Sequence, residues 1–164
     1  MTWAGIGLGS NLGDSRDHLR TAITSLREHH RLLRISSLFQ TAPVGPIDQP
    51  DFTNAAILVD TDAEPLALLR ELHEVERSRG RDRSSEVRFG PRSLDLDILL
   101  WDGLHMEDSS LTIPHPRLAE RRFALEPLIE VWPDATFPDG TRILDLWPTV
   151  AGQVSTKLQG PTWL

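Results

Sequence analysis

The stretch that most constrains the fold runs from Ser93 to Trp101, Ser-Leu-Asp-Leu-Asp-Ile-Leu-Leu-Trp. Its side chains alternate with the two-residue period of a β-strand, in which successive residues point to opposite faces. Asp95 and Asp97 share one face with Leu99. The other face is expected to be apolar and to carry Leu94, Leu96, Ile98 and Leu100. The stretch is therefore predicted to be a half-buried strand.

Two aspartates on one strand face need a stabilising partner, because Asp is depleted in strands and neighbouring like charges repel. Strand geometry holds Asp95 and Asp97 on one side, roughly 6 to 7 Å apart at the backbone. A divalent cation between them is the simplest candidate. Magnesium fits best, since it prefers oxygen and commonly takes one or two carboxylates plus substrate phosphates. The plainer alternative is an edge strand whose solvent face is acidic.

Arginines gather immediately before this strand, although the net charge of the chain is -7. An acidic chain is not expected to be a general nucleic-acid binder. A local anion site is expected instead, because the planar guanidinium suits bidentate phosphate contacts. A chain-wide preference for Arg is the alternative, as Lys157 is the only lysine. The segment comprises Arg77, Arg79, Arg81, Arg83, Arg88 and Arg92.

The chain is expected to form a single domain over residues 1–164, with residues 155–164 as a loosely ordered tail. It contains no cysteine, so no disulfide or thiolate metal site is expected. Its first residues lack the basic and apolar regions of a signal peptide, and no stretch is long enough to span a bilayer. We therefore expect a cytoplasmic protein, and a monomer.

Strands and helices alternate along the chain, which predicts an α+β domain with helices packed on one face of a mainly antiparallel sheet. A ferredoxin-like sandwich fits this order best. The glycines near the N-terminus match neither the dinucleotide-binding nor the P-loop spacing. Residues 80–92 are predicted to be a mobile loop. The expected strands are Trp3–Ser10, Leu32–Thr41 and Phe52–Asp60, and the expected helices run from Asp14 or Ser15 to about His30, from Pro65 to about Arg79 with Leu66, Leu69, Leu72 and Val75 facing the core, and from Arg117 to Glu130.

Several motifs together resemble one family, the 6-hydroxymethyl-7,8-dihydropterin pyrophosphokinases of folate biosynthesis. The resemblance covers about residues 3 to 138 and implies a ferredoxin-like fold, magnesium, and transfer of diphosphate from ATP to the pterin hydroxymethyl group with release of AMP. The motifs are Gly7-Leu-Gly-Ser-Asn-Leu-Gly13, Thr41-Ala-Pro-Val-Gly-Pro46, Phe52-Thr-Asn-Ala-Ala56, Gly90-Pro-Arg-Ser-Leu-Asp-Leu-Asp97 and Pro114-His-Pro-Arg117.

The resemblance also implies residue roles. Asp95 and Asp97 match the ligands of two magnesium ions. Phe52 and Phe123 match the aromatic walls around the pterin, and Asn54 matches the residue that bonds the ring edge. Thr41, Pro43, Val44, Phe89 and Asp95 complete the pterin site. The positions that match ATP-binding residues are His73, Glu76, Arg81, Arg83, Arg88, Arg92, Ile98, Thr112, His115 and Arg121, and the catalytic set is Arg81, Arg83, Arg92, Asp95 and Asp97.

Three positions depart from the family pattern. Members often carry Trp where Phe89 stands, a basic residue where Ser110 stands, and Gln where His73 stands. No residue is an obvious general base, and Asp97 is the candidate for guiding the hydroxyl proton. If triphosphate orders the Arg-rich loop, ATP should bind before the pterin.

Two other functions are compatible with the residues. One is an ATP-dependent transferase of the same fold that acts on a different flat heterocycle; tight binding of a pterin beside an ATP analogue would separate it. The other is a non-enzymatic module that binds RNA or protein. Its strands should expose aromatic residues, but Tyr is absent from the chain and the predicted strand carries aspartates.

Overall fold

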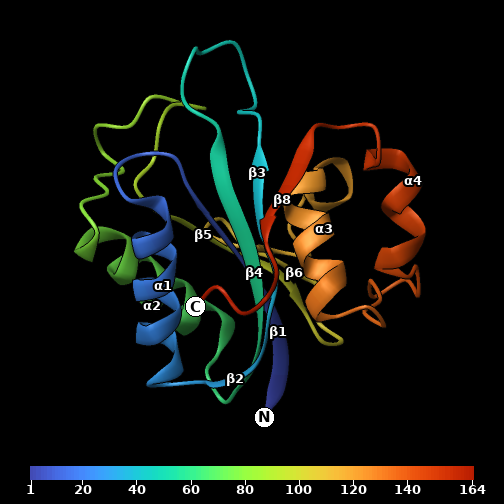
Figure 1. Cartoon of the computed structure of the whole chain (residues 1–164). Helices are drawn as coiled ribbons and strands as arrows, with labels where there is room; N and C mark the ends of the chain where they lie inside the picture. The colour runs from blue at the N-terminus through green and yellow to red at the C-terminus, as the bar shows by residue number, and fades with distance from the viewer.

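The computed structural model describes residues 1–164 and is built on a six-stranded antiparallel sheet (Figure 1). The strands run in the order β5-β1-β4-β3-β8, and β2 also pairs with β4. A separate two-stranded sheet is formed by β6 (Met106–Glu107) and β7 (Thr112–Ile113). The strands of the main sheet are β1 (Thr2–Ser10), β2 (Arg31–Ile35), β3 (Leu38–Thr41), β4 (Phe52–Thr61), β5 (Asp95–Trp101) and β8 (Ser155–Gln159).

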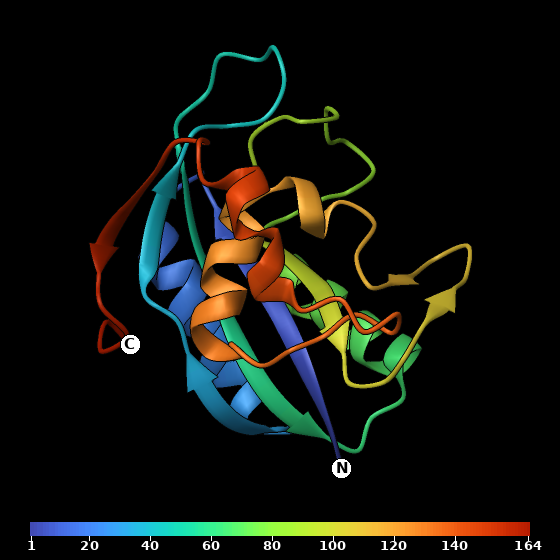
Figure 2. The ribbon, with the colours of Figure 1, turned by 90° about the vertical axis from the view of Figure 1, so that its right-hand side faces the viewer.

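Helices cover both faces of the sheet, so the expectation of helices on one face is wrong (Figures 1 and 2). The reason lies in β4, where Ile57 is buried in one apolar cluster while Ala56 and Leu58 are buried in the other. A strand that is apolar on both faces needs cover on both. On one face lie α1 (Ser15–Arg27) and α2 (Pro65–Ser78), and on the other α3 (Arg122–Val131) and α4 (Trp147–Val150), with short 3-10 turns at Leu118–Glu120 and Ile143–Leu146.

Helix α1 begins where the sequence predicts. The Asp14 carboxylate caps it by accepting from the Asp17 backbone N–H at 3.1 Å. Leu19, Ile23 and Leu26 are buried on one stripe, as expected. The helix ends at Arg27, shorter than the predicted limit near His30.

Helix α2 has Pro at its first turn, where the missing N–H costs nothing. Leu72 and Val75 are buried, as predicted, whereas Leu66 and Leu69 are only half-buried. Leu68 occupies the centre of the buried stripe instead. The apolar stripe is thus rotated slightly from the predicted one, and it brings Glu76 to the buried side.

The predicted strand Leu32–Thr41 is divided into β2 and β3 at Ser36 and Ser37. The Ser36 hydroxyl accepts from the Ala56 backbone N–H at 2.8 Å. The Ser37 N–H and hydroxyl both donate to the Glu130 carboxylate of α3. Serine side chains that bond to neighbouring backbone compete with the strand ladder, which accounts for the break.

Strand β5 carries a register shift that the alternating sequence does not reveal. Across β1, Gly5 is opposite Leu100 and Ile6 is opposite Ile98, so Leu99 is an extra residue in the ladder. Such a bulge inverts the alternation beyond it. Leu99 and Leu100 both join the apolar cluster on the α3 side, and the predicted orientation of Leu100 is therefore wrong.

The C-terminal segment is also different from the expectation, because residues 155–164 are not a loose tail. Ser155–Gln159 form β8, which pairs antiparallel with β3 and adds a strand to the sheet (Figure 2). Trp163 is only 3% exposed, and its indole N–H donates to the Ser36 carbonyl at 2.8 Å. The segment is anchored by both packing and hydrogen bonds.

No helix of the structure has the length and apolar character needed to cross a membrane.

Candidate active site

A pocket opens on the α3 side of the sheet, and glycines of β1 form its floor. Gly9 lies opposite Asn54 of β4 and opposite Asp95 of β5, and Gly7 lies opposite Asp97. A Cβ on Gly9 would come within 2.8 Å of the Asn54 side-chain oxygen. The alternating glycines therefore leave room for the polar side chains of both neighbouring strands, a role that sequence reasoning missed although Gly5, Gly7 and Gly9 recur at strand period.

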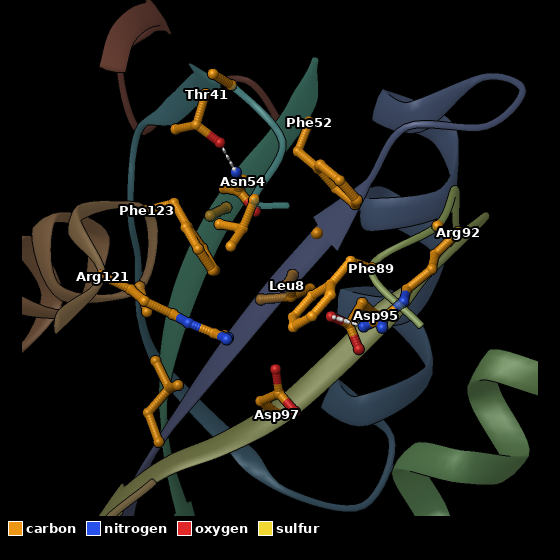
Figure 3. A pocket seen from close by; sticks show the side chains of 18 residues that line it. Leu8, Thr41, Phe52, Asn54, Phe89, Arg92, Asp95, Asp97, Arg121 and Phe123 are labelled. Carbon is orange, nitrogen blue, oxygen red and sulfur yellow. Dashed lines mark hydrogen bonds and ion pairs between the residues drawn. The ribbon is translucent and has the colours of Figure 1, made fainter. Parts of the chain in front are cut away.

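One half of the pocket is aromatic and comes from regular secondary structure (Figure 3). Phe52 opens β4, Asn54 follows it on the same face, and Phe123 belongs to the first turn of α3. The Asn54 amide is 5% exposed and donates to the Thr41 hydroxyl at 2.5 Å. The pocket wall thus presents two rings and one oriented amide oxygen, which suits a flat, polar-edged heterocycle.

The other half carries the predicted acidic pair. Asp95 and Asp97 share a face of β5 and project into the same pocket, as the alternation predicts (Figure 3). Both carboxylate oxygens of Asp95 accept from guanidinium groups, one from Arg81 at 2.9 Å and the other from Arg92 at 3.0 Å. Asp97 has no such partner, so the two carboxylates lie in opposite electrostatic environments.

The pKa values diverge accordingly. Burial acts to raise the pKa of Asp95, but the nearby guanidinium groups of Arg92 and Arg81 outweigh it and hold that pKa below its usual range. Burial raises the pKa of Asp97 to about 7, and the charge of Asp95 adds to this effect. A buried carboxylate without a counter-ion favours the neutral form until a cation arrives.

The donor set fits magnesium. No third acidic or histidine side chain joins Asp95 and Asp97 in a metal-ligand cluster. The remaining oxygen ligands would have to come from substrate phosphates and water, as is common for magnesium. The buried Nε of Arg92 has no hydrogen-bond acceptor, which is the kind of group that a phosphate satisfies.

Residues 80–92, here called the Arg loop, are tied down by ion pairs that centre on Glu76 at the end of α2. The Glu76 carboxylate is 1% exposed and accepts from Arg81, Arg83 and the Leu96 backbone N–H, at 2.6, 2.8 and 2.8 Å. Burial raises the pKa of Glu76 in spite of these donors. The pKa of Arg81 is raised, because hydrogen bonds and charges from Glu86, Asp95 and Glu76 outweigh its burial.

Phe89 of the Arg loop lines the pocket on the side opposite its glycine floor. Its backbone adopts φ 61°, a left-handed conformation that is strained for a bulky residue. Its ring faces the Arg88 guanidinium at 4.8 Å from the ring centroid. Phe89 also meets Gly45 in residues 42–51, which connect β3 to β4 and are here called the Pro-rich loop. A Cβ added at Gly45 would lie 3.1 Å from the Phe89 Cβ. The Phe89 carbonyl accepts from Gln49 at 2.5 Å. The two loops are thus in contact over the site.

Asn11 is a site residue that sequence reasoning missed. It is 6% exposed, its backbone N–H donates to the Arg92 carbonyl at 3.0 Å, and its side-chain oxygen accepts from the Arg92 backbone N–H at 2.8 Å. Its amide donates to Gln49 at 2.9 Å and to the Pro50 carbonyl. Asn11 therefore links the Pro-rich loop to the Arg loop. An Asn in a glycine-rich turn has an ordinary turn interpretation, which hides this role.

The structure brings together most, but not all, of the predicted residues. A polar cavity beside the pocket is lined by the predicted His73, Glu76, Arg81 and Arg83. Pro43, Arg88, Ile98, Thr112 and His115 line neither cavity, and Ile98 is buried in the core. Burial and the charge of Arg121 lower the pKa of His115, and burial and the charge of Arg83 lower that of His73. The pocket contains the predicted Thr41, Val44, Phe52, Asn54, Phe89, Arg92, Asp95, Asp97, Arg121 and Phe123.

Comparisons with known proteins point to one enzyme family. A 2-amino-4-hydroxy-6-hydroxymethyldihydropteridine pyrophosphokinase of Bacillus subtilis is 44% identical over 77% of this chain and 75% of its own length. One from Haemophilus influenzae is 38% identical over 96% of this chain and 99% of its own length. The fold is similar to that of Plasmodium falciparum HPPK-DHPS, with a TM-score of 0.67 and 15% identity over 90% of this chain and 43% of that longer one.

The family model described as 7,8-dihydro-6-hydroxymethylpterin-pyrophosphokinase (HPPK) matches residues 5–133, a range that holds every residue lining the pocket. Together with the two pyrophosphokinase relatives, which match 77% and 96% of the chain, this match confirms the resemblance noted in the sequence. This chain belongs to the 7,8-dihydro-6-hydroxymethylpterin-pyrophosphokinase family.

Proposed function

We propose that the pocket transfers the diphosphate of ATP to the hydroxymethyl group of 6-hydroxymethyl-7,8-dihydropterin, giving AMP and the pterin diphosphate for folate synthesis. The observation that carries this proposal is the single pocket in which an aromatic half and an acidic, Arg-rimmed half face one another (Figure 3). A flat ring placed between Phe52 and Phe123 would direct its substituent toward Asp95 and Asp97. Aromatic stacking of this kind is worth about 0.5 to 1.5 kcal/mol per pair.

The acidic half is proposed to hold two magnesium ions through Asp95 and Asp97. Bound magnesium would neutralise triphosphate charge and hold the phosphates in position for in-line attack. The raised pKa of Asp97 supports this role, because a carboxylate that resists ionisation alone is ready to pair with a cation. Asp97 is also our candidate for guiding the proton of the attacking hydroxyl.

The phosphates are proposed to contact Arg92 of the main pocket. They are also proposed to contact Arg81 and Arg83 of the polar cavity beside it, where His73 and Glu76 would contact the adenosine. In this arrangement the guanidinium groups would stabilise charge and align the nucleotide, and no covalent intermediate is needed. Arg88, Arg121, Thr112, Ile98 and His115 complete the proposed nucleotide site. Thr41, Pro43, Val44 and Phe89 complete the proposed pterin site.

We also propose that the enzyme works as a monomer, in the cytoplasm where ATP is at hand. The deciding assay incubates the chain with magnesium, ATP and the hydroxymethyl-dihydropterin and separates the nucleotides. AMP formed in step with pterin diphosphate supports the proposal. ADP, or no pterin-dependent nucleotide turnover, would contradict it.

A further inference from the structure

Arg81 is the most completely paired cation in the molecule, and one of its partners has no assigned role. Its side chain is 2% exposed. Its Nη1 donates to Glu76 at 2.6 Å and to Asp95 at 2.9 Å, and also reaches the Leu94 carbonyl. Its Nε and Nη2 donate side by side to the two carboxylate oxygens of Glu86, at 2.5 and 3.0 Å. The guanidinium edge best suited to a phosphate is thus already occupied.

Glu86 differs from the other two acids around Arg81. Glu76 lies in the last turn of α2 and is also held by the Leu96 backbone N–H, and Asp95 opens β5, so both are fixed by rigid elements. Glu86 belongs to the Arg loop itself, its side chain is 19% exposed, and its carboxylate bonds to Arg81 alone. Of the three acids, it is the one that can leave Arg81 without breaking another contact.

A carboxylate on the Nε–Nη2 edge takes the same bidentate geometry as a phosphate group. We propose that Glu86 is an internal stand-in for nucleotide phosphate, which occupies Arg81 in the resting chain and is displaced when the nucleotide binds. This inference rests on the proposed function, because it assumes that Arg81 meets phosphate. Glu86 therefore lowers nucleotide affinity, because a ligand must displace it from Arg81 before it can bind there.

The paired arrangement favours the metal–nucleotide complex over either component. Arg81 and Arg92 hold both oxygens of Asp95. A bare cation at Asp95 would displace guanidinium groups without offering them an anion. A bare nucleotide would displace Glu86 and leave the acids of the site without added positive charge. Because unpaired charges in a half-buried site are costly, the complex that supplies both charges exchanges all the pairs at once.

The test compares two substitutions in the full chain that each replace one Glu by Gln and so remove one negative charge. Glu86→Gln removes the bidentate partner of Arg81. Glu28→Gln is the matched control, since Glu28 is exposed at the end of α1 and lines neither cavity. Calorimetry measures binding of a non-hydrolysable ATP analogue with magnesium. We expect Glu86→Gln to bind roughly tenfold more tightly than the unsubstituted chain and Glu28→Gln to change affinity by less than about twofold.

Trypsin cleavage after Arg83 and Arg88 supplies a readout that is independent of turnover. Without nucleotide, Glu86→Gln should be cut faster than the unsubstituted chain, because the loop has lost an anchor; with the analogue, both should be protected. Glu86→Asp, which keeps the charge, should retain the weaker affinity. Thermal melting checks that each variant is folded.

If Glu86→Gln is cut faster but binds the analogue more weakly than the unsubstituted chain, Glu86 merely supports the loop, and the inference is overturned. Equal affinities of Glu86→Gln and the unsubstituted chain would overturn it as well. Both outcomes leave the proposed function intact. If the unsubstituted chain fails to bind the analogue with magnesium, the proposed function itself is wrong, and the inference is wrong with it.

Discussion

The two halves of the pocket are held in place by different forces. Phe52, Asn54 and Phe123 lie on β4 and α3, where packing and backbone hydrogen bonds fix them without a ligand. Arg81 instead lies in the Arg loop and is held there by ion pairs with Glu76, Glu86 and Asp95. The aromatic half is therefore ready for its ligand. The charged half must exchange internal partners for external ones before it can act.

The largest effect is expected from the charged half. Asp97→Asn keeps the shape of the side chain but removes the charge that we propose holds a cation, and should lower pterin-dependent AMP formation by about a thousandfold or more. Glu107→Gln, at an exposed side chain on β6, is the control and should leave the rate unchanged. Near-normal turnover of Asp97→Asn with magnesium would remove Asp97 from the mechanism.

The aromatic half should respond differently. Asn54→Ala removes a buried amide beside Thr41 and should weaken pterin binding roughly 10- to 100-fold, as expected when a ligand loses a buried hydrogen-bond partner. Binding of an ATP analogue should be nearly unchanged, because Asn54 lies in the other half. Calorimetry with each ligand measures both effects. A comparable loss of nucleotide affinity would show that the two halves are not separate units.

A smaller effect should connect the halves. Phe89 belongs to the Arg loop and also lines the aromatic pocket, so a nucleotide that orders the loop should improve pterin binding by about fivefold or more. The pterin is titrated with and without the analogue and magnesium. Equal affinities would mean that the loop does not transmit nucleotide binding, and the expected order of ATP before pterin would lose its basis.

The smallest effect concerns stability without metal. The pKa of Asp97 is raised from 3.8 to about 7 in the folded chain, so folding takes up a proton between these pH values. Stability from this group therefore falls as pH rises through that window. In the presence of EDTA, Asp97→Asn should melt a few degrees above the unsubstituted chain at pH 8, with a smaller difference at pH 5. A difference that grows toward acid would reverse the sign and refute the assignment.

Periodicity predicted the parts of the site that depend on local geometry. Asp95 and Asp97 share a face because strand side chains alternate. The alternation is regular from Asp95 to Ile98, before the bulge at Leu99. Beyond the bulge the same rule failed for Leu100. The pairing of β8 with β3 joins segments that are distant in the chain, and no local pattern marks it. Composition likewise marked the Arg loop as polar but could not say which acid pairs with which arginine.

Glu86 shows the same limit most clearly. It sits among Ser and Arg residues without periodicity, and its significance appears only when the loop folds back and places it on Arg81. Resemblance to a family assigns roles only to positions that match one of the family's motifs. No motif covers the counter-ion inside the Arg loop, and only the geometry identifies it.

The bare floor of the pocket has a consequence for inhibitor design. At Gly9 even one added carbon would collide with the Asn54 oxygen, and at Gly7 it would press on Leu99 at 3.1 Å. A compound seated on this floor would therefore contact positions where replacements damage the site itself. Drug resistance by substitution should then arise in the loops above the ligand, and seldom beneath it.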